Sequence, residues 1–149
     1  VGPDVLGAAL GQDKVVQKQV LKAEGINVVD FIWFYENEYK TNEEDILKNI
    51  KKLGYPVVVK PAKLGSSIGI NYVADDKTII DAINDAIQYD DKIIVEKAVD
   101  NLLEIDCAVL GDSNYTEVSL IGEMLTDNEI LTFEDKSKRF NDSTIVSAI

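Results

Sequence analysis

The chain has 149 residues, 46% of them hydrophobic, which fits one ordinary folded domain or two small parts that share a core. It has no histidine and one cysteine, which excludes Ser–His and Cys–His catalysis, imidazole metal sites and an internal disulfide, and makes a cytoplasmic location the default. The 15 basic and 27 acidic residues give a formal net charge of −12, which disfavours partners such as nucleic acid or an anionic membrane, and no apolar run has the length of a membrane span.

The first part of the chain alternates helical and strand patterns. Residues 12–25 predict a helix that ends at Gly25, and residues 26–34 predict a strand. Residues 41–54 predict the clearest helix, which Thr41 or Asn42 caps and Gly54 ends. The apolar faces of the two helices are Val15, Val16, Val20 and Leu21 in the first, and Ile46, Leu47, Ile50 and Leu53 in the second.

The middle of the chain predicts two strands, a helix and a third strand. The strands are residues 56–60, 68–73 and 92–98, and a loop rich in glycine and serine separates the first two. The helix is residues 76–89, and its inward side chains are expected to be Ile79, Ile80, Ile83 and Ile87.

The last part of the chain has weaker patterns. Residues 103–110 predict a strand whose first half alternates, so we expect one wet face, and residues 115–125 predict one more strand. Residues 131–143 are polar and aperiodic, and we expect a mobile loop there. The final apolar run "STIVSAI" stops in mid-pattern, so the chain is expected to be part of a longer protein.

The segment "VVVKPAKLGSSIGINYV", residues 57–73, has two interpretations. It is either a β-hairpin whose lysine reaches solvent, or a phosphate clamp. Gly65 and Gly69 allow a ligand to approach the backbone closely, and Ser66 and Ser67 add hydroxyl and N–H donors. Lys60 lies at the strand end, within reach of a phosphate. The Walker A pattern is absent, and a Gly-Ser-Ser turn alone is more often only a turn.

The segment "IIVEKAVDNLLEIDCAV", residues 93–109, also allows two interpretations. Free backbone groups at the end of a strand, near Glu96 and Lys97, can bind the edge of an adenine, and the carboxylate of Glu104 can accept both hydroxyls of a ribose. Alternatively, these charges keep an edge strand from aggregating. Composition alone favours the second interpretation.

Taken in order, the motifs resemble those of the ATP-grasp enzymes, and specifically the D-alanine–D-alanine ligases. The opening "VGPDVLGAALGQDKVVQKQVLKAEGI" is similar to the start of that family's central domain, and "VVVKPAKLGSSIGI" to its lysine and glycine-rich loop. The segments "IIVEKAVDNLLEIDCAVLG" and "EVSLIGEM" resemble its nucleotide-base segment and the strand that follows. The resemblance covers nearly the whole chain.

The resemblance implies an α+β, ATP-grasp fold in which two lobes with antiparallel sheets grip ATP. Residues 1–101 are then the central domain, and residues 102–149 the truncated start of the C-terminal domain. The implied reaction uses ATP and D-alanine: one D-alanine carboxylate becomes an acyl phosphate, which the amine of a second D-alanine attacks to give a dipeptide for peptidoglycan. Mg²⁺ (or Mn²⁺) is the implied ion, with ligands in a C-terminal part that this chain lacks. The resemblance leaves room for a homodimer of the full-length protein, and the fragment alone is expected to be inactive.

The resemblance also implies roles for individual residues. Lys14 and Lys60 hold the ATP phosphates, and Gly65, Ser66 and Ser67 close over them. Glu96, Lys97 and Val99 line the adenine, and Glu104 binds the ribose. Ser67 and Lys136 are the residues expected to take part in catalysis, Lys136 from the mobile loop.

Two positions depart from the family's pattern. Ser137 stands where a tyrosine commonly shapes the second-substrate pocket, which allows D-lactate or D-serine as the second substrate. Leu103 stands where an arginine is common. Another ATP-grasp ligase, against which "KPAKLGSSIG" argues, and a nucleotide-binding module without chemistry of its own remain alternatives.

Overall fold

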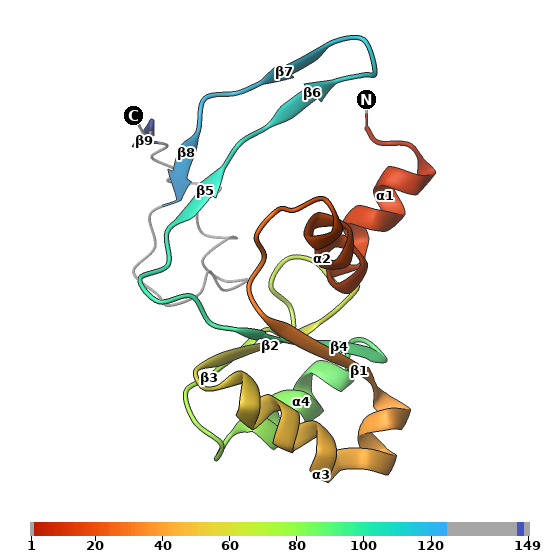
Figure 1. Cartoon of the computed structure of the whole chain (residues 1–149), viewed down its shortest axis with the longest axis vertical. Helices are drawn as coiled ribbons and strands as arrows, with labels where there is room; N and C mark the ends of the chain where they lie inside the picture. Colours follow the sequence, from red (N-terminus) through yellow and green to blue (C-terminus); the bar gives the residue numbers. More distant parts are fainter. Residues whose placement is uncertain (1, 125–145, 148–149) are drawn as a thin grey trace. The chain divides into compact units, whose positions relative to one another are not determined.

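The computed structural model describes residues 2–124, 146 and 147, and the chain divides into two compact units, Val1–Val99 and Asp100–Ile149. Figure 1 shows the elements of both, and each unit is described by itself. The predicted loop 131–143, with Lys136 and Ser137, lies outside the described residues.

The first unit is built on a four-stranded sheet in the order β1-β4-β2-β3. Its strands are β1 (Phe31–Tyr35), β2 (Val57–Pro61), β3 (Asn71–Val73) and β4 (Lys92–Lys97), and every neighbouring pair is antiparallel. The central strand β4 pairs with β1 on one side and with β2 on the other, which places Glu96 opposite Val58. The two inner strands, β4 and β2, are almost entirely buried.

One face of this sheet carries the main hydrophobic core. The helices α3 (Glu36–Leu53) and α4 (Ile79–Ile87) cover it, as Figure 1 shows. The core contains strand residues Phe34, Val57, Val59, Val73, Ile93 and Val95, and helix residues Tyr39, Ile50, Ile79, Ala82, Ile83 and Ala86. The alternation of the strands sends the residues between them to the other face.

The opposite face is covered by α2 (Lys14–Ala23), which follows α1 (Val5–Gln12). A small apolar cluster of Val15, Ala62 and Ile94 joins α2 to the sheet. Lys60 and Glu96 come between core residues on β2 and β4, so their side chains lie on this second face. The second face is therefore where charged side chains gather.

Helix α2 matches the prediction for residues 12–25. It ends in a Schellman motif, in which the N–H groups of Gly25 and Ile26 donate to the carbonyls of Lys22 and Leu21. Gly25 has a φ of 77°, the left-handed conformation that this motif requires. At the other end of the helix, the N-cap is Asp13, whose carboxylate accepts hydrogen bonds from the first N–H groups of the helix.

Four predictions in the first unit need correction. The strand expected over 68–73 is only β3, which begins at Asn71. The strand expected over 26–34 is only β1, which begins at Phe31. The helix expected over 41–54 begins earlier, at Glu36, and breaks at Asn42, whose φ of −135° and ψ of 37° are not helical. Ile80 was expected to face inward but is 42% exposed, because Ala82 and Ala86 rather than Ile80 complete the buried face of α4.

The second unit consists of short antiparallel strands. They are β5 (Glu104–Asp106), β6 (Val109–Gly111), β7 (Thr116–Val118), β8 (Gly122–Met124) and β9 (Val146–Ser147), with sheet orders β5-β8-β9 and β6-β7. The single strands predicted over 103–110 and 115–125 are each split in two. At the split, Ala108 and Ser119 exchange hydrogen bonds: the N–H of Ala108 donates to Ser119 Oγ, and the N–H of Ser119 donates to the carbonyl of Ala108.

The single wet face predicted for the first half of residues 103–110 is not found, because Asp106 is exposed like the apolar residues beside it. Leu103 and Ile105 are exposed, whereas Glu104 between them is half-buried.

Among the described residues, no helix combines the length and the apolar character needed to cross a membrane.

Candidate functional site

Lys60 is the first functional candidate that the fold positions. It is the fourth residue of β2, on the second face of the sheet, with Ile94 of β4 opposite it in the register. Its ammonium lies 2.6 Å from Glu96 Oε2. The lysine at the end of the "VVV" strand therefore does not simply extend into solvent, since it makes a part-buried ion pair inside the unit.

Glu96 is a buried carboxylate that two lysines hold. Its Oε2 contacts Lys60, and its Oε1 lies 3.1 Å from the ammonium of Lys18 on α2. Burial alone favours the neutral acid, but the positive charge of Lys60, the hydrogen bond from Lys60 and the charge of Lys18 outweigh it and lower the pKa of Glu96. The carboxylate is therefore ionised at neutral pH and orients two ammonium groups.

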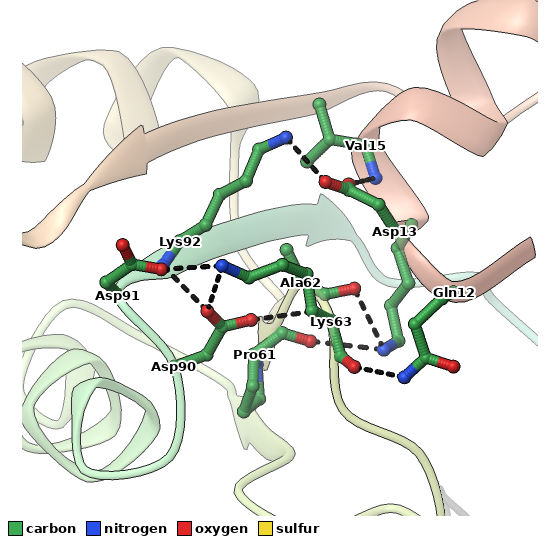
Figure 2. Close-up of polar contacts among 10 residues, drawn as sticks. Gln12, Asp13, Val15, Pro61, Ala62, Lys63, Asp90, Asp91 and Lys92 are labelled. Atoms are coloured by element: carbon green, nitrogen blue, oxygen red, sulfur yellow. Dashed lines mark hydrogen bonds and ion pairs between the residues drawn. The ribbon is translucent and has the colours of Figure 1, made fainter. Parts of the chain in front are cut away.

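Lys14 lies in the first turn of α2 and reaches the stem of the Gly-Ser-Ser loop. Its ammonium donates to the carbonyls of Pro61 (3.1 Å), Ala62 (3.3 Å) and Leu64, and its backbone N–H donates to the carbonyl of Ala62. Figure 2 draws the first two of these partners, Pro61 and Ala62. Burial, and next the nearby positive charge of Lys60, lower the pKa of Lys14. Three main-chain carbonyls thus hold one cation directly beside the loop.

The loop itself has an unusual backbone. Ser66 and Ser67 have φ angles of 55° and 58°, and Gly69 has a φ of 67°. A Cβ at Gly69 would lie 2.6 Å from the ring of Tyr89 and 2.9 Å from Pro61, so only glycine fits there. A Cβ at Gly65 would meet nothing within 4 Å. The loop is anchored at one end and open at the other, a shape that can close over a ligand.

The three lysines give this face a local positive charge. Lys14, Lys18 and Lys60 carry three positive charges and Glu96 carries one negative charge, so the cluster has a net charge of about +2. The chain as a whole has a net charge of −12. A polyanion such as a nucleotide phosphate is therefore attracted to this cluster and repelled by most of the remaining surface.

The fold of the first unit also positions two of the other predicted residues, Lys97 and Val99. Lys97 follows Glu96 and points to the opposite face, where its ammonium donates to the carbonyls of Gly54 (3.2 Å) and Tyr55 (2.8 Å). Val99 is half exposed at the end of the first unit. Glu104 belongs to the second unit, and Lys136 lies outside the described residues.

Two contributors to the site were missed by the sequence reasoning. Lys18 is one helical turn after Lys14, so the i, i+4 spacing could have placed both on one face. Asp13 precedes the helix as its cap, and a capping rule could have found it. Its partner Lys92 is 79 positions away, and no local pattern indicates that contact.

Among the residues that the structure describes, no group of three or more acidic, cysteine or histidine side chains is arranged to hold a metal ion.

Residues 20–149 match the family model described as "D-ala D-ala ligase C-terminus". The chain therefore belongs to the D-alanine–D-alanine ligase family. The resemblance inferred from the motifs, and the α+β ATP-grasp fold class, are confirmed.

Two bacterial members of the family show the extent of the match. The D-alanine–D-alanine ligase of Macrococcus caseolyticus is 38% identical over 139 residues, which are 93% of this chain and 38% of that protein. The ligase of Thermoanaerobacter sp. strain X514 is 41% identical over 136 residues, which are 91% of this chain and 37% of that protein. The chain thus spans well under half the length of these relatives.

Solved structures of the family have the same fold. The D-alanine–D-alanine ligase from Helicobacter pylori superposes with a TM-score of 0.72 at 27% identity, over 83% of this chain and 36% of that one. The VanG D-Ala:D-Ser ligase from Enterococcus faecalis superposes with a TM-score of 0.73 at 35% identity, over 80% of this chain and 34% of that one.

Proposed function

We propose that the protein containing this chain is an ATP-dependent D-alanine–D-alanine ligase and that the chain supplies its ATP-binding part. The observation that carries the proposal is the cluster of Lys14, Lys18 and Lys60 beside the loop of Ser66 and Ser67. The polyphosphate of ATP carries several negative charges, which a compact group of ammonium ions matches. Residues 1–101 then belong to the central domain, and residues 102–149 begin the C-terminal one.

The lysines and the loop act on the phosphates in different ways. Lys60 uses one N–H on Glu96 and retains donors for a phosphate, while Lys14 adds its charge at the loop stem. Gly65 lies in open space, so the loop of Ser66 and Ser67 can approach the phosphates with its backbone and hydroxyl donors. These residues stabilise charge and fix geometry, which are the main requirements of phosphoryl transfer.

We propose that the segment after β4 binds the adenine base and the ribose of ATP. The N–H of Lys97 already donates to the carbonyl of Asp30, and its ammonium has carbonyl partners, so the half-exposed Val99 is the better candidate for a main-chain contact with adenine. Glu96 contributes through its charge, and Glu104 accepts from the ribose hydroxyls. We propose that Ser67 and Lys136 are the two residues that take part in catalysis, both by contacting the phosphate.

In the proposed reaction the carboxylate of one D-alanine attacks the terminal phosphorus of ATP. A new O–P bond forms as the bond to ADP breaks, and the amine of a second D-alanine then attacks the acyl carbon and releases inorganic phosphate. Mg²⁺, when bound, would neutralise charge on the phosphates, and we propose none of the described residues as its ligand. A cytoplasmic location and a homodimer complete the proposal.

A D-Ala:D-Ser or D-Ala:D-lactate ligase is the second candidate. It is favoured by Ser137, at a position where the family commonly has a tyrosine. The 35% identity to a structure named as a D-Ala:D-Ser ligase points the same way. This candidate shares the ATP-binding part and differs only in the second substrate.

A substrate screen on the protein that contains this sequence separates the candidates. The protein is given ATP and Mg²⁺ with D-alanine alone, with D-alanine plus D-serine, and with D-alanine plus D-lactate, while ADP and the product mass are followed. We expect ADP and D-alanyl-D-alanine from D-alanine alone. A mixed product formed in preference would support the second candidate, and no ADP under any condition would contradict both.

A further inference from the structure

A second ion pair lies next to the lysine cluster without belonging to it. Asp13 Oδ2 is 2.8 Å from the ammonium of Lys92, and their side chains are only 17% and 8% exposed. Asp13 Oδ1 caps α2 by accepting from the N–H groups of Val15 and Val16. The ammonium of Lys92 also lies over the ring of Trp33, 4.9 Å from its centroid. Both partners are therefore held in place on several sides, and Figure 2 shows the ion pair itself.

The pair connects the start of α2, which carries Lys14, to β4, which holds the stem of the loop. Asp13 immediately precedes Lys14, so the position of the cap sets the position of that lysine. Lys92 reaches the loop stem through its backbone, because its carbonyl accepts from the N–H of Ala62. The carbonyl of Ala62 in turn accepts from the N–H and the ammonium of Lys14. Asp13, Lys92, Ala62 and Lys14 thus form a closed ring of contacts.

The stability of the fold does not by itself explain this pair. Removing two charges from water costs about as much as their attraction returns, and apolar residues of similar volume often stabilise as well. An ion pair with hydrogen bonds does, however, define one geometry, since both partners must meet at short range. Burial favours the neutral acid, but the hydrogen bond from Lys92 and those from the helix N–H groups outweigh it and lower the pKa of Asp13.

We propose that the Asp13–Lys92 ion pair is a positioning device, which holds Lys14 and the stem of the 65–69 loop in the geometry that binds the phosphates of ATP. The pair itself does not touch the nucleotide. The inference rests on the proposed function, because it assumes that the lysine cluster binds phosphate. It adds two positioning residues, from α2's cap and from β4, that the site residues inferred from the sequence do not include.

Substitutions can remove the pair while keeping the cap. Asp13→Asn retains an oxygen that accepts from the helix N–H groups, and asparagine is as good a cap as aspartate, but the charge is lost. Lys92→Met retains the length of the side chain without its charge, and Lys92→Arg retains the charge. Lys40→Met is the matched control, because it removes an exposed ion pair with Glu36 on α3.

The experiment measures the Kd of ATP and of adenosine by calorimetry, and the Tm without ligand, for each variant of the protein that contains this sequence. We expect Asp13→Asn and Lys92→Met to weaken ATP binding about tenfold. Adenosine, which lacks phosphates, should bind them as it binds the wild type. Lys92→Arg should bind ATP more tightly than Lys92→Met, and Lys40→Met should match the wild type.

The outcomes distinguish this inference from the proposed function. If the wild type does not bind ATP, the proposed function fails and the inference fails with it. If the wild type binds ATP and both charge-removing variants bind it equally well, only the inference is overturned. An equal loss of ATP and adenosine binding also overturns it, because the pair would then support the fold rather than the phosphate contacts.

Discussion

Glu96 shows how one buried side chain can organise a binding site. It is 6% exposed on β4, between Lys60 of β2 and Lys18 of α2. Without the carboxylate, the two ammonium groups would repel each other, and each would prefer solvent. With it, both are held at the sheet face and need little further ordering when a phosphate arrives. The same carboxylate competes with the phosphate for these ammonium groups. It therefore both prepares the site for ATP and limits the affinity for ATP.

The pH dependence of stability tests the charge state of Glu96. Because its folded-state pKa is below the ordinary value of 4.5, its contribution is fully present above pH 4.5 and is lost as the pH falls through the folded-state pKa. We expect Glu96→Gln to lower the free energy of unfolding by about 1–3 kcal/mol near pH 7. The difference from the wild type should shrink below pH 4.5 in urea titrations. A difference that is constant from pH 7 to pH 3 would mean that the carboxylate is not ionised in the fold.

The residues of the site were predictable where the chemistry is local in sequence. Lys60 and the loop of Gly65, Ser66 and Ser67 stand together in one motif, which allowed a phosphate clamp or a plain turn, and the resemblance to the family favoured the clamp. The pairing of Lys60 with Glu96 is set by the register of β2 on β4, which no short motif records. Lys92 and Asp13 meet only because α2 covers that face of the sheet.

Helix α4 illustrates the same limit at the scale of an element. Its isoleucine pattern correctly predicted a helix with an inward face, and Ile79 and Ile83 are buried. The pattern did not predict which residues of the helix lie closest to the sheet, because the small alanines can approach the sheet more closely than isoleucines can. Ala82 and Ala86 occupy the contact, and Ile80 turns to solvent.

Two substitutions in α4 test this orientation. Ile83→Ala should lower the free energy of unfolding by about 2–5 kcal/mol, because it leaves a cavity in the core. Ile80→Ala makes the same chemical change at an exposed position and should cost less than about 1 kcal/mol. Chemical denaturation of both variants gives the comparison. Equal costs would show that the helix is rotated from the described orientation.

The start of α3 was not predictable from periodicity. The segment "ENEYK" is mostly polar, and its turn is held by the side chain of Glu38, which accepts from the N–H of Tyr35 at 2.8 Å. Tyr39 then packs on Phe34, with ring centroids 5.7 Å apart. A local capping box and hydrophobic staple therefore extend the helix before Asn42, which the apolar periodicity suggested as its cap.

At the scale of the whole molecule, the distribution of charge matters more than its total. The acidic surface repels anions in general, and the lysine cluster attracts them at one place. That contrast favours a ligand with concentrated negative charge over an extended polyanion such as nucleic acid. The family membership of the chain, and its span of well under half of the relatives, fit the ATP-binding part of a larger ligase.

The affinity of the Lys60→Ala variant for ATP shows whether the lysine cluster binds phosphate. In the protein that contains this sequence, we expect Lys60→Ala to weaken ATP binding about 10- to 100-fold, since it removes a charge-assisted contact to phosphate. Lys40→Ala, which removes an exposed lysine of α3, should bind ATP like the wild type. If Lys60→Ala binds ATP as tightly as Lys40→Ala does, the lysine cluster is not a phosphate clamp.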